Sequence, residues 1–143
     1  MQKCYNLNIN MFNAENSLPA GQAKQLSPVT LAFVGDAVYS LYVRAKLVLQ
    51  SDKKPAELQK QSSASVSARG QSELLKRLEP RFSPEEREIF LRGRNAKKAT
   101  KSKNAGVAEY NRSTGFEAVL GFLYLTGNSQ RIYELLEEEN NAN

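Results

Sequence analysis

The sequence predicts an all-α fold in a single domain, and three observations support this. Its 143 residues suffice for one hydrophobic core and are few for two domains. Apolar residues recur at helical spacing, and no stretch has the strict alternation of a β-strand. Serine followed by proline, a helix start signal, stands before two stretches with apolar residues at that spacing. Charged residues interrupt the longest apolar stretches, so we expect a soluble protein without a membrane span.

The N-terminal residues predict an arm rather than a helix. Residues 1–25 have no clear hydrophobic period and carry several asparagines together with Pro19 and Gly21. Such a composition is typical of a poorly ordered or irregular lead-in. The domain itself is predicted to cover residues 26–139, and residues 140–143 to form a tail.

The first helix of the domain is predicted to run from Val29 to Leu49. Ser27 supplies a capping hydroxyl before it, and Pro28 is the residue favoured at the first helical position. Apolar residues cover most of the circumference of this helix. That distribution predicts a central and largely buried helix.

A second helical stretch is predicted from Pro55 to Leu78, after a polar turn at residues 51–54. We interpret it as helix in one or two pieces, because its serines and Gly70 weaken the helical pattern. Serine side chains offer the backbone competing hydrogen bonds, and an interior glycine costs about 1 kcal/mol relative to alanine.

The next helix has the clearest local signal. Ser83 and Glu86 have the spacing of a capping box, in which each side chain bonds the other's backbone N–H. The helix is predicted to start at Ser83 and to end at Gly93, because glycine commonly follows the last helical turn.

Two helices are predicted in the last third of the chain. Ser113 or Thr114 is expected to begin an apolar helix that reaches Thr126 and is closed by Gly127. A final helix is expected over residues 130–139. With these elements every predicted segment of regular structure is helical.

The residue inventory excludes several kinds of active site. The chain has no histidine and a single cysteine, Cys4. It therefore cannot form a His/Cys zinc site, a Ser/His/Asp triad or a Cys/His dyad. Any metal must be held by oxygen ligands, which suit magnesium or manganese. The lone cysteine and the absence of a leader pattern indicate the cytoplasm.

Positive charge is concentrated in one segment. The whole chain carries +5, with a pI near 9.4, which favours polyanionic partners in general. Between Arg92 and Arg112 there are seven basic residues and one acidic residue, a net charge of +6. Residues 94–108 are predicted to form a loop that binds a polyanion, and the alternative is a solvated flexible loop.

Two carboxylates stand inside strongly apolar helical stretches. Asp36 and Glu117 occupy positions where a hydrophobic residue would be cheaper to bury. A buried carboxylate is normally paired, protonated or bound to a cation. Gly35 lies next to Asp36 and Gly121 one turn beyond Glu117, and glycine within a helix often allows close approach of a backbone or ligand.

Two interpretations of these acids remain open on the residues alone. In the first, the two helices present both carboxylates to one cation. In the second, Asp36 pairs with Arg44 or another cation at a rim, and Glu117 pairs likewise with Arg112. The second is favoured at this point, because buried acids are more often members of structural ion pairs than catalysts.

Two motifs resemble the signature helices of the ribonuclease III domain. They are Phe33-Val-Gly-Asp-Ala-Val-Tyr and, some eighty residues later, Phe116-Glu-Ala-Val-Leu-Gly-Phe-Leu-Tyr-Leu. The resemblance extends through Arg92-Gly-Arg-Asn-Ala-Lys and Tyr110-Asn-Arg-Ser-Thr to the short bacterial branch called Mini-ribonuclease III. That branch lacks a double-stranded-RNA-binding domain.

This resemblance implies a helical homodimer that hydrolyses double-stranded RNA with magnesium, for which manganese is expected to substitute. Asp36 and Glu117 correspond to the catalytic, metal-binding acids of the two signatures. Ordinary ribonuclease III has further acids one turn earlier, where this chain has Ala32 and Thr114. The implied reaction is metal-assisted hydrolysis, in which the cation activates a water and polarises the phosphate.

The resemblance also implies partners. RNA is expected to be recognised mainly by shape, through phosphates and the wide minor groove. The family's known substrate is the precursor of 23S ribosomal RNA, cleaved with help from a large-subunit ribosomal protein. A noncatalytic RNA-binding or ribosome-associated protein on the same fold remains the alternative. The residues expected to contact RNA are Arg92, Arg94, Asn95, Lys97, Lys98, Lys101 and Lys103.

Overall fold

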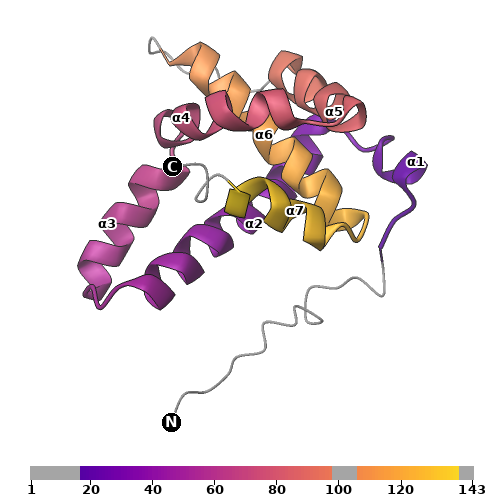
Figure 1. Ribbon diagram of the computed structural model, residues 1–143. Coiled ribbons are helices and arrows are strands. Elements are labelled where there is room, and N and C mark those ends of the chain that lie inside the picture. Colours follow the sequence, from indigo (N-terminus) through magenta and orange to yellow (C-terminus); the bar gives the residue numbers. More distant parts are fainter. Residues whose placement is uncertain (1–16, 98–105, 139–143) are drawn as a thin grey trace.

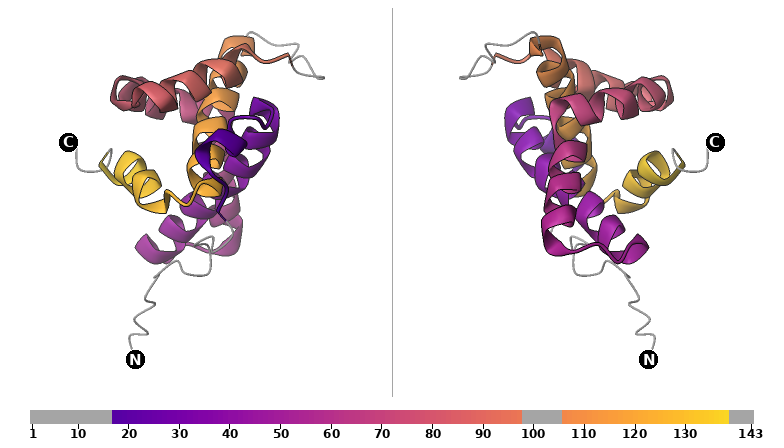
Figure 2. Two further views of the ribbon diagram at one scale, coloured as in Figure 1. Left: turned by 90° about the vertical axis from the view of Figure 1, so that its right-hand side faces the viewer. Right: turned by 90° about the vertical axis from the view of Figure 1, so that its left-hand side faces the viewer.

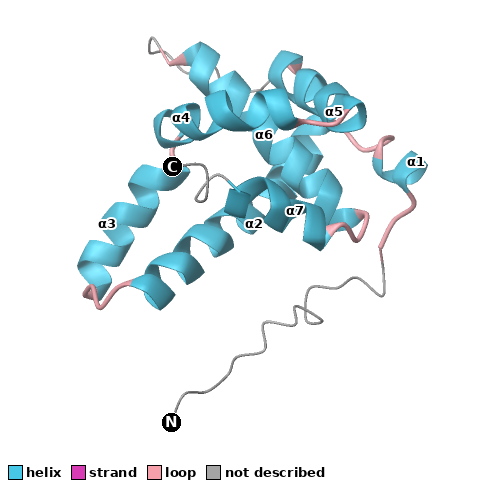
Figure 3. Ribbon diagram, viewed as in Figure 1, coloured by secondary structure: helices cyan, strands magenta, loops and turns pink. Residues whose placement is uncertain are grey.

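The computed structural model describes residues 17–97 and 106–138, and within these ranges all regular structure is helical (Figure 3). The predicted all-α class is therefore confirmed. The elements are α1 (Ala20–Ala23), α2 (Pro28–Gln50), α3 (Pro55–Val66), α4 (Ala68–Leu78), η2 (Glu79–Arg81), α5 (Pro84–Asn95), α6 (Val107–Leu125) and α7 (Ser129–Glu138).

Helices α2 and α6 form the centre of the molecule (Figure 1). They share the most extensive contact between any two elements, and α5 and α4 pack against α6. Helix α7 lies to one side of this pair, while α3 diverges from the C-terminal half of α2 (Figure 2). No helix in the described ranges is both long and apolar enough to cross a membrane.

Helix α2 begins as the sequence predicts. The Ser27 hydroxyl accepts a hydrogen bond from the Thr30 N–H at 3.0 Å, and Pro28 occupies the first helical position. The expectation of a largely buried helix is wrong, however. Phe33 is 82% exposed, and Leu41 and Val48 are exposed as well. Helix α6 covers only one side of α2, so apolar residues on the other side remain at the surface.

Glycines bring the backbones of α2 and α6 into direct contact. A Cβ added at Gly35 would lie 1.6 Å from the carbonyl oxygen of Glu117, and one at Gly121 would lie 1.9 Å from that of Leu31. Any side chain at these two positions would force the helices apart. Because neither position carries a side chain, the middle of α2 lies directly against the middle of α6.

Glycines also allow a close contact between the backbones of α5 and α6. A Cβ at Gly93 would lie 2.8 Å from the Cα of Gly115. Gly93 was expected to end its helix, but α5 continues to Asn95, so this glycine serves a close helix crossing instead. The start of α5 is confirmed, since Ser83 and Glu86 form both hydrogen bonds of a capping box.

Helix α6 starts earlier than the sequence indicates. It begins at Val107, and Ser113 and Thr114 lie buried in its interior. Both hydroxyls donate to the carbonyl oxygen of Tyr110, at 2.8 and 3.1 Å, which satisfies them within the helix. The predicted closure at Gly127 is confirmed, because this residue has a positive φ of 78° after the last turn.

The stretch from Pro55 to Leu78 consists of two helices, as one of the two interpretations held. Ser67 separates them, in extended conformation, and its hydroxyl accepts a hydrogen bond from the Gly70 N–H at 3.0 Å. Serine thus provides the cap that ends α3 and begins α4. The orientation of α3 relative to α4 follows from this break.

Part of the expected N-terminal arm belongs to the folded domain. The Leu18 N–H donates to the Leu125 carbonyl at 2.7 Å, and Ala23 in α1 is completely buried. Arg92 on α5 donates to the carbonyl oxygens of Lys24 and Leu26 at 3.1 and 3.4 Å. Residues 1–16 of the arm and the tail at 140–143 lie outside the described residues.

Candidate active site

The acids singled out by the sequence come together where α2 crosses α6. The side chain of Asp36, on α2, and that of Glu117, on α6, lie within hydrogen-bonding reach of each other. The contact between Gly35 and the Glu117 backbone explains this proximity, because it sets the two helices at their closest approach beside the acids. The fold therefore joins two residues about eighty positions apart.

The electrostatics of this acidic pair are unfavourable for two negative charges. Burial, together with the hydrogen bond to Asp36 and the negative charge of Asp36, raises the pKa of Glu117 to about 9. Asp36 itself is exposed, whereas Glu117 is partly buried. Glu117 therefore holds a proton at neutral pH unless a cation takes the proton's place between the carboxyl groups.

A divalent cation fits this donor set. Carboxylate oxygens suit hard cations, and a positive charge between Asp36 and Glu117 would remove the repulsion that raises the pKa of Glu117. Within residues 17–97 and 106–138 there is no group of three or more His, Cys, Asp or Glu side chains placed to hold a metal. The pair would thus leave much of the coordination shell to water and to phosphate oxygens.

The ion-pair interpretation of these acids is wrong. Arg112, the expected partner of Glu117, instead pairs with Glu79 on η2 at 3.4 Å. Arg44 makes no ion pair with Asp36 in the part of the chain that the structure describes. The two acids face each other and not the basic partners that this interpretation gave them.

The positions one turn before each acid add no ligand. Ala32 is buried and carries no polar group. Thr114 is also buried, and its hydroxyl is used in the hydrogen bond to the Tyr110 carbonyl. The acidic pair is accordingly the whole of the carboxylate set at this crossing among the described residues.

The candidate RNA-binding residues divide into three groups. Arg92 is bound to the α1–α2 connection through two backbone carbonyls. Arg94, Asn95 and Lys97 lie at the C-terminal end of α5, where the Arg94 Nε donates to the Asn95 Oδ1 at 3.2 Å. Lys98, Lys101 and Lys103 lie outside the described residues.

An exposed apolar stripe runs along α2 next to the acidic pair. It consists of Val29, Phe33, Leu41 and Val48, which share one side of the helix. The sequence indicated that some apolar residues would serve an interface but did not identify these. The available signal was that apolar residues surround α2, more than one packed face requires.

Comparisons with known proteins assign the chain to a family. Residues 29–128 match the Ribonuclease III domain family. A protein named Mini-ribonuclease 3 from Thermoanaerobacter sp. is 47% identical over 112 residues, covering 78% of this chain and 79% of the relative. The one from Staphylococcus aureus is 45% identical over 117 residues, covering 80% and 87%. A crystal structure of a Fusobacterium nucleatum protein is 30% identical, with a TM-score of 0.72, covering 82% of this chain and 94% of that one.

Proposed function

This chain belongs to the ribonuclease III family, in its Mini-ribonuclease III branch, and on that premise we propose that Asp36 and Glu117 together bind the metal ion used in RNA cleavage. Membership makes the protein an endoribonuclease that acts on double-stranded RNA, in a family that generally uses a divalent metal. The specific assignment of the ion is magnesium, with manganese able to substitute. One observation carries the proposal: two acids from separate helices meet without a basic partner.

The two acids have different tasks in this proposal. A bound cation would supply a water of lowered pKa and would stabilise charge on the phosphate. Glu117 is partly buried and held by the backbone contact at Gly35, so it provides a fixed oxygen donor. Asp36 is exposed, so its carboxylate faces the side from which a duplex can approach. No nucleophilic side chain is required, in keeping with the absence of histidine.

We assign the active form to a homodimer. The apolar stripe on α2 supports this assignment, because large exposed apolar side chains gathered on one side of a helix are typical of a protein interface. Asp36 lies at the edge of the stripe. A dimer formed through α2 would therefore bring the two acidic pairs to either side of one surface, on which a duplex could bind.

The contacts to RNA are assigned to the end of α5 and the segment after it. Arg94, Asn95 and Lys97 are the described members of this group, and Lys98, Lys101 and Lys103 join them on the sequence alone. Such contacts bind phosphates with little reference to base sequence, so affinity should fall steeply as salt increases. The proposed natural substrate is the 23S ribosomal RNA precursor, with a large-subunit ribosomal protein as helper in the cytoplasm.

A cleavage assay tests the acidic pair. Asp36→Asn and Glu117→Gln should each lower the rate of duplex cleavage in magnesium by more than about a hundredfold, since each removes a charged metal ligand. Helical content and oligomeric state should remain those of the wild type. Glu109→Gln, at the start of α6, is the matched control and should cleave normally.

Two outcomes would contradict the proposal. Normal cleavage by either variant would exclude that residue from the site. Tight duplex binding by the wild type without cleavage in magnesium or manganese would favour the noncatalytic RNA-binding alternative.

A further inference from the structure

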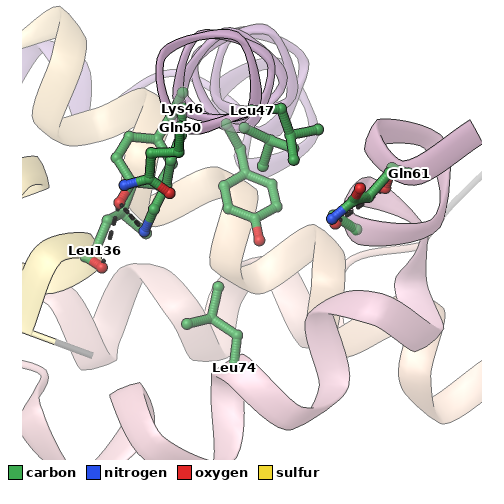
Figure 4. Close-up of a pocket in the computed structure, with 10 residues that line it drawn as sticks. Lys46, Leu47, Gln50, Gln61, Leu74 and Leu136 are labelled. Atoms are coloured by element: carbon green, nitrogen blue, oxygen red, sulfur yellow. Dashed lines mark hydrogen bonds between the residues drawn. The ribbon is translucent and has the colours of Figure 1, made fainter. Parts of the chain in front are cut away.

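A cavity of about 280 Å³ lies between α2, α3, α4 and α7 (Figure 4). It lies along α2 from Tyr39 to Gln50, and neither Asp36 nor Glu117 lines it. Helix α3 contributes Gln61 and Ser65 to its wall, and these side chains are polar. The space between α3 and α4 is therefore not filled by an apolar core.

The cavity has an apolar floor and a polar rim. Leu47 and Leu74 are among the apolar residues that line it, together with Val43 and Leu136. Lys46 and Gln50 lie on one side and Gln61 on the other, with Leu74 below and between them (Figure 4). A ligand that fits these walls has a flat or apolar body and polar groups at both ends.

Lys46 gives one end of the cavity a positive charge. Its Nζ donates to the Tyr42 hydroxyl at 3.4 Å and lies 5.5 Å from the centre of that ring. The Tyr42 hydroxyl in turn donates to the Glu137 Oε1 at 2.9 Å, so the phenol stands between the two charges. An ammonium group has three donors, and the Tyr42 bond uses one of them. This side of the cavity can therefore bind an anionic group.

The glutamines give the cavity carboxamide groups on opposite sides. Each carboxamide combines a donor and an acceptor, the pattern that pairs with the edge of a nucleobase. The Gln61 Oε1 accepts a hydrogen bond from the Lys53 Nζ, which orients the amide and leaves its NH₂ group as the donor available to a ligand. Pockets for drug-sized ligands are roughly 300–1,000 Å³, and a cavity just below this range suits a ligand no larger than a single nucleotide.

We propose that this cavity binds one nucleotide carrying a terminal phosphate, with the phosphate at Lys46 and the base between Gln50 and Gln61 above Leu74. Two sources share this chemistry, a free mononucleotide and the end of an RNA strand. Hydrolysis of a phosphodiester leaves a phosphate monoester on one of the two new ends, so the enzyme's own products carry the group. The strand-end source rests on the cleavage activity, whereas the free nucleotide does not.

A nuclear magnetic resonance titration of the full-length protein tests the proposal with 5′-AMP and adenosine as probes. AMP should shift the backbone amides of Leu47, Ser65 and Leu74 with a single Kd and should bind about tenfold more tightly than adenosine, the effect of one charge-assisted contact. Lys46→Met should remove that advantage and leave the adenosine Kd unchanged. Lys60→Met, an exposed lysine on α3 outside this cavity, should bind AMP as the wild type does.

A second variant separates binding from folding. Ser65→Leu should fill the cavity and abolish the shifts with both probes while the helical spectrum is retained. The proposal is overturned if millimolar AMP shifts none of the cavity amides, or if the shifts surround Asp36 alone. It is likewise overturned if the folded Ser65→Leu variant binds AMP normally.

Short single-stranded RNA with and without a terminal phosphate distinguishes the two sources. Shifts at the cavity amides with the phosphorylated strand, and not with the unphosphorylated one, would assign the cavity to strand ends as well as to AMP. Shifts with AMP alone would assign it to free nucleotide. Duplex cleavage is measured on the same samples, so a wild-type protein that cleaves the duplex but shows no shifts at the cavity amides would overturn the cavity proposal and leave the proposed function standing.

Discussion

At the scale of single residues, Arg92 shows that a basic side chain beside a charged segment can serve the fold. Its guanidinium donates to two carbonyl oxygens in the connection between α1 and α2. These carbonyls follow the last turn of α1, where free acceptors need a donor. Arg92 thus attaches the N-terminal segment to α5, a role that its position in a basic stretch did not indicate.

We predict that Arg92→Ala lowers the free energy of unfolding by about 1–3 kcal/mol, since partly buried carbonyls lose a charged donor. Its effect on the salt dependence of RNA binding should be small. Lys97→Ala, the control at the exposed end of α5, should change stability by less than about 0.5 kcal/mol. It should lower the slope of log affinity against log salt by about 1. Urea denaturation measures the stability of each variant, and RNA binding at several salt concentrations measures the salt slope. An unchanged stability with a lower salt slope for Arg92→Ala would place Arg92 at the RNA.

A second residue-scale effect concerns pH. Glu86 is 4% exposed and forms an ion pair with Arg131, with contacts of 2.8 and 2.9 Å. Burial of Glu86 opposes its ionisation, but hydrogen bonds from Arg131 and Ser83 outweigh burial and hold its pKa below the ordinary 4.5. Because the folded state favours the ionised form, this group stabilises the protein fully above pH 4.5. That contribution is lost as the pH falls through the lowered pKa.

We therefore predict that Glu86→Gln costs about 1.5–3 kcal/mol of unfolding free energy at neutral pH, the usual value for hydrogen bonds to charged groups. The difference from the wild type should shrink as the pH falls below 4.5. Glu85→Gln, which removes the more exposed pair with Lys24, should cost less than about 1 kcal/mol. Urea denaturation at a series of pH values and fixed protein concentration measures the unfolding free energy of each variant. A Glu86→Gln deficit that stays constant with pH would contradict the assignment.

At the scale of helices, close crossings decide the geometry of the site. Gly35 and Gly121 let α2 and α6 touch through their backbones, and Gly93 does the same for α5. A one-residue shift at the first crossing would turn Asp36 away from Glu117 by about 100° around the helix axis. The acidic pair therefore depends on two residues that contribute no side chain.

We predict that Gly121→Ala destabilises the protein by about 3 kcal/mol or more, despite the higher helix propensity of alanine, because its Cβ would meet the Leu31 carbonyl. Cleavage should fall as well in any fraction that folds, since the acids would separate. Gly21→Ala is the control: its Cβ would meet nothing within 4 Å, so stability should be unchanged or slightly raised. Thermal denaturation and the cleavage assay provide the measurements. Equal stability of the two variants would show that the helices can separate at little cost.

The helices also show what a sequence can and cannot predict. The starts of α2 and α5 were predictable because serine and proline act on their own neighbours, within one turn. The start of α6 was not, since Ser113 resembles a cap but its hydroxyl bonds a carbonyl inside the helix. The end at Gly93 was also misplaced, because a crossing partner cannot be read from local sequence.

The candidate site was predictable in its residues but not in its environment. Asp36 and Glu117 stood out as charges in apolar helices, and the family motifs favoured a shared site over separate ion pairs. Their meeting depends on the crossing of α2 with α6, which lies beyond local patterns. The pairing of Arg112 with Glu79 is a tertiary contact of the same kind, and it removed the competing interpretation.

At the scale of the whole molecule, the exposed stripe on α2 is the feature that supports the proposed homodimer. An apolar helix face is normally buried against another element, but among residues 17–97 and 106–138 nothing covers Phe33, which is 82% exposed. The sequence could not separate a buried core face from an interface face, because both are apolar. A second copy of the same stripe is the simplest partner, since a twofold axis pairs a surface with itself.

We predict that Phe33→Glu converts the protein to a monomer that keeps its helical content. A charge placed in an apolar interface loses solvation when the copies associate. Each loss of about 1.4 kcal/mol in association free energy raises the dissociation constant of the dimer tenfold. Leu49→Glu is the matched control, because Leu49 is also exposed but lies about 160° around α2 from Phe33. Sedimentation velocity should find the control as a dimer and Phe33→Glu as a monomer at the same concentration. Duplex cleavage by Phe33→Glu should fall as the dimer is lost. A dimeric and active Phe33→Glu variant would exclude the stripe as the interface.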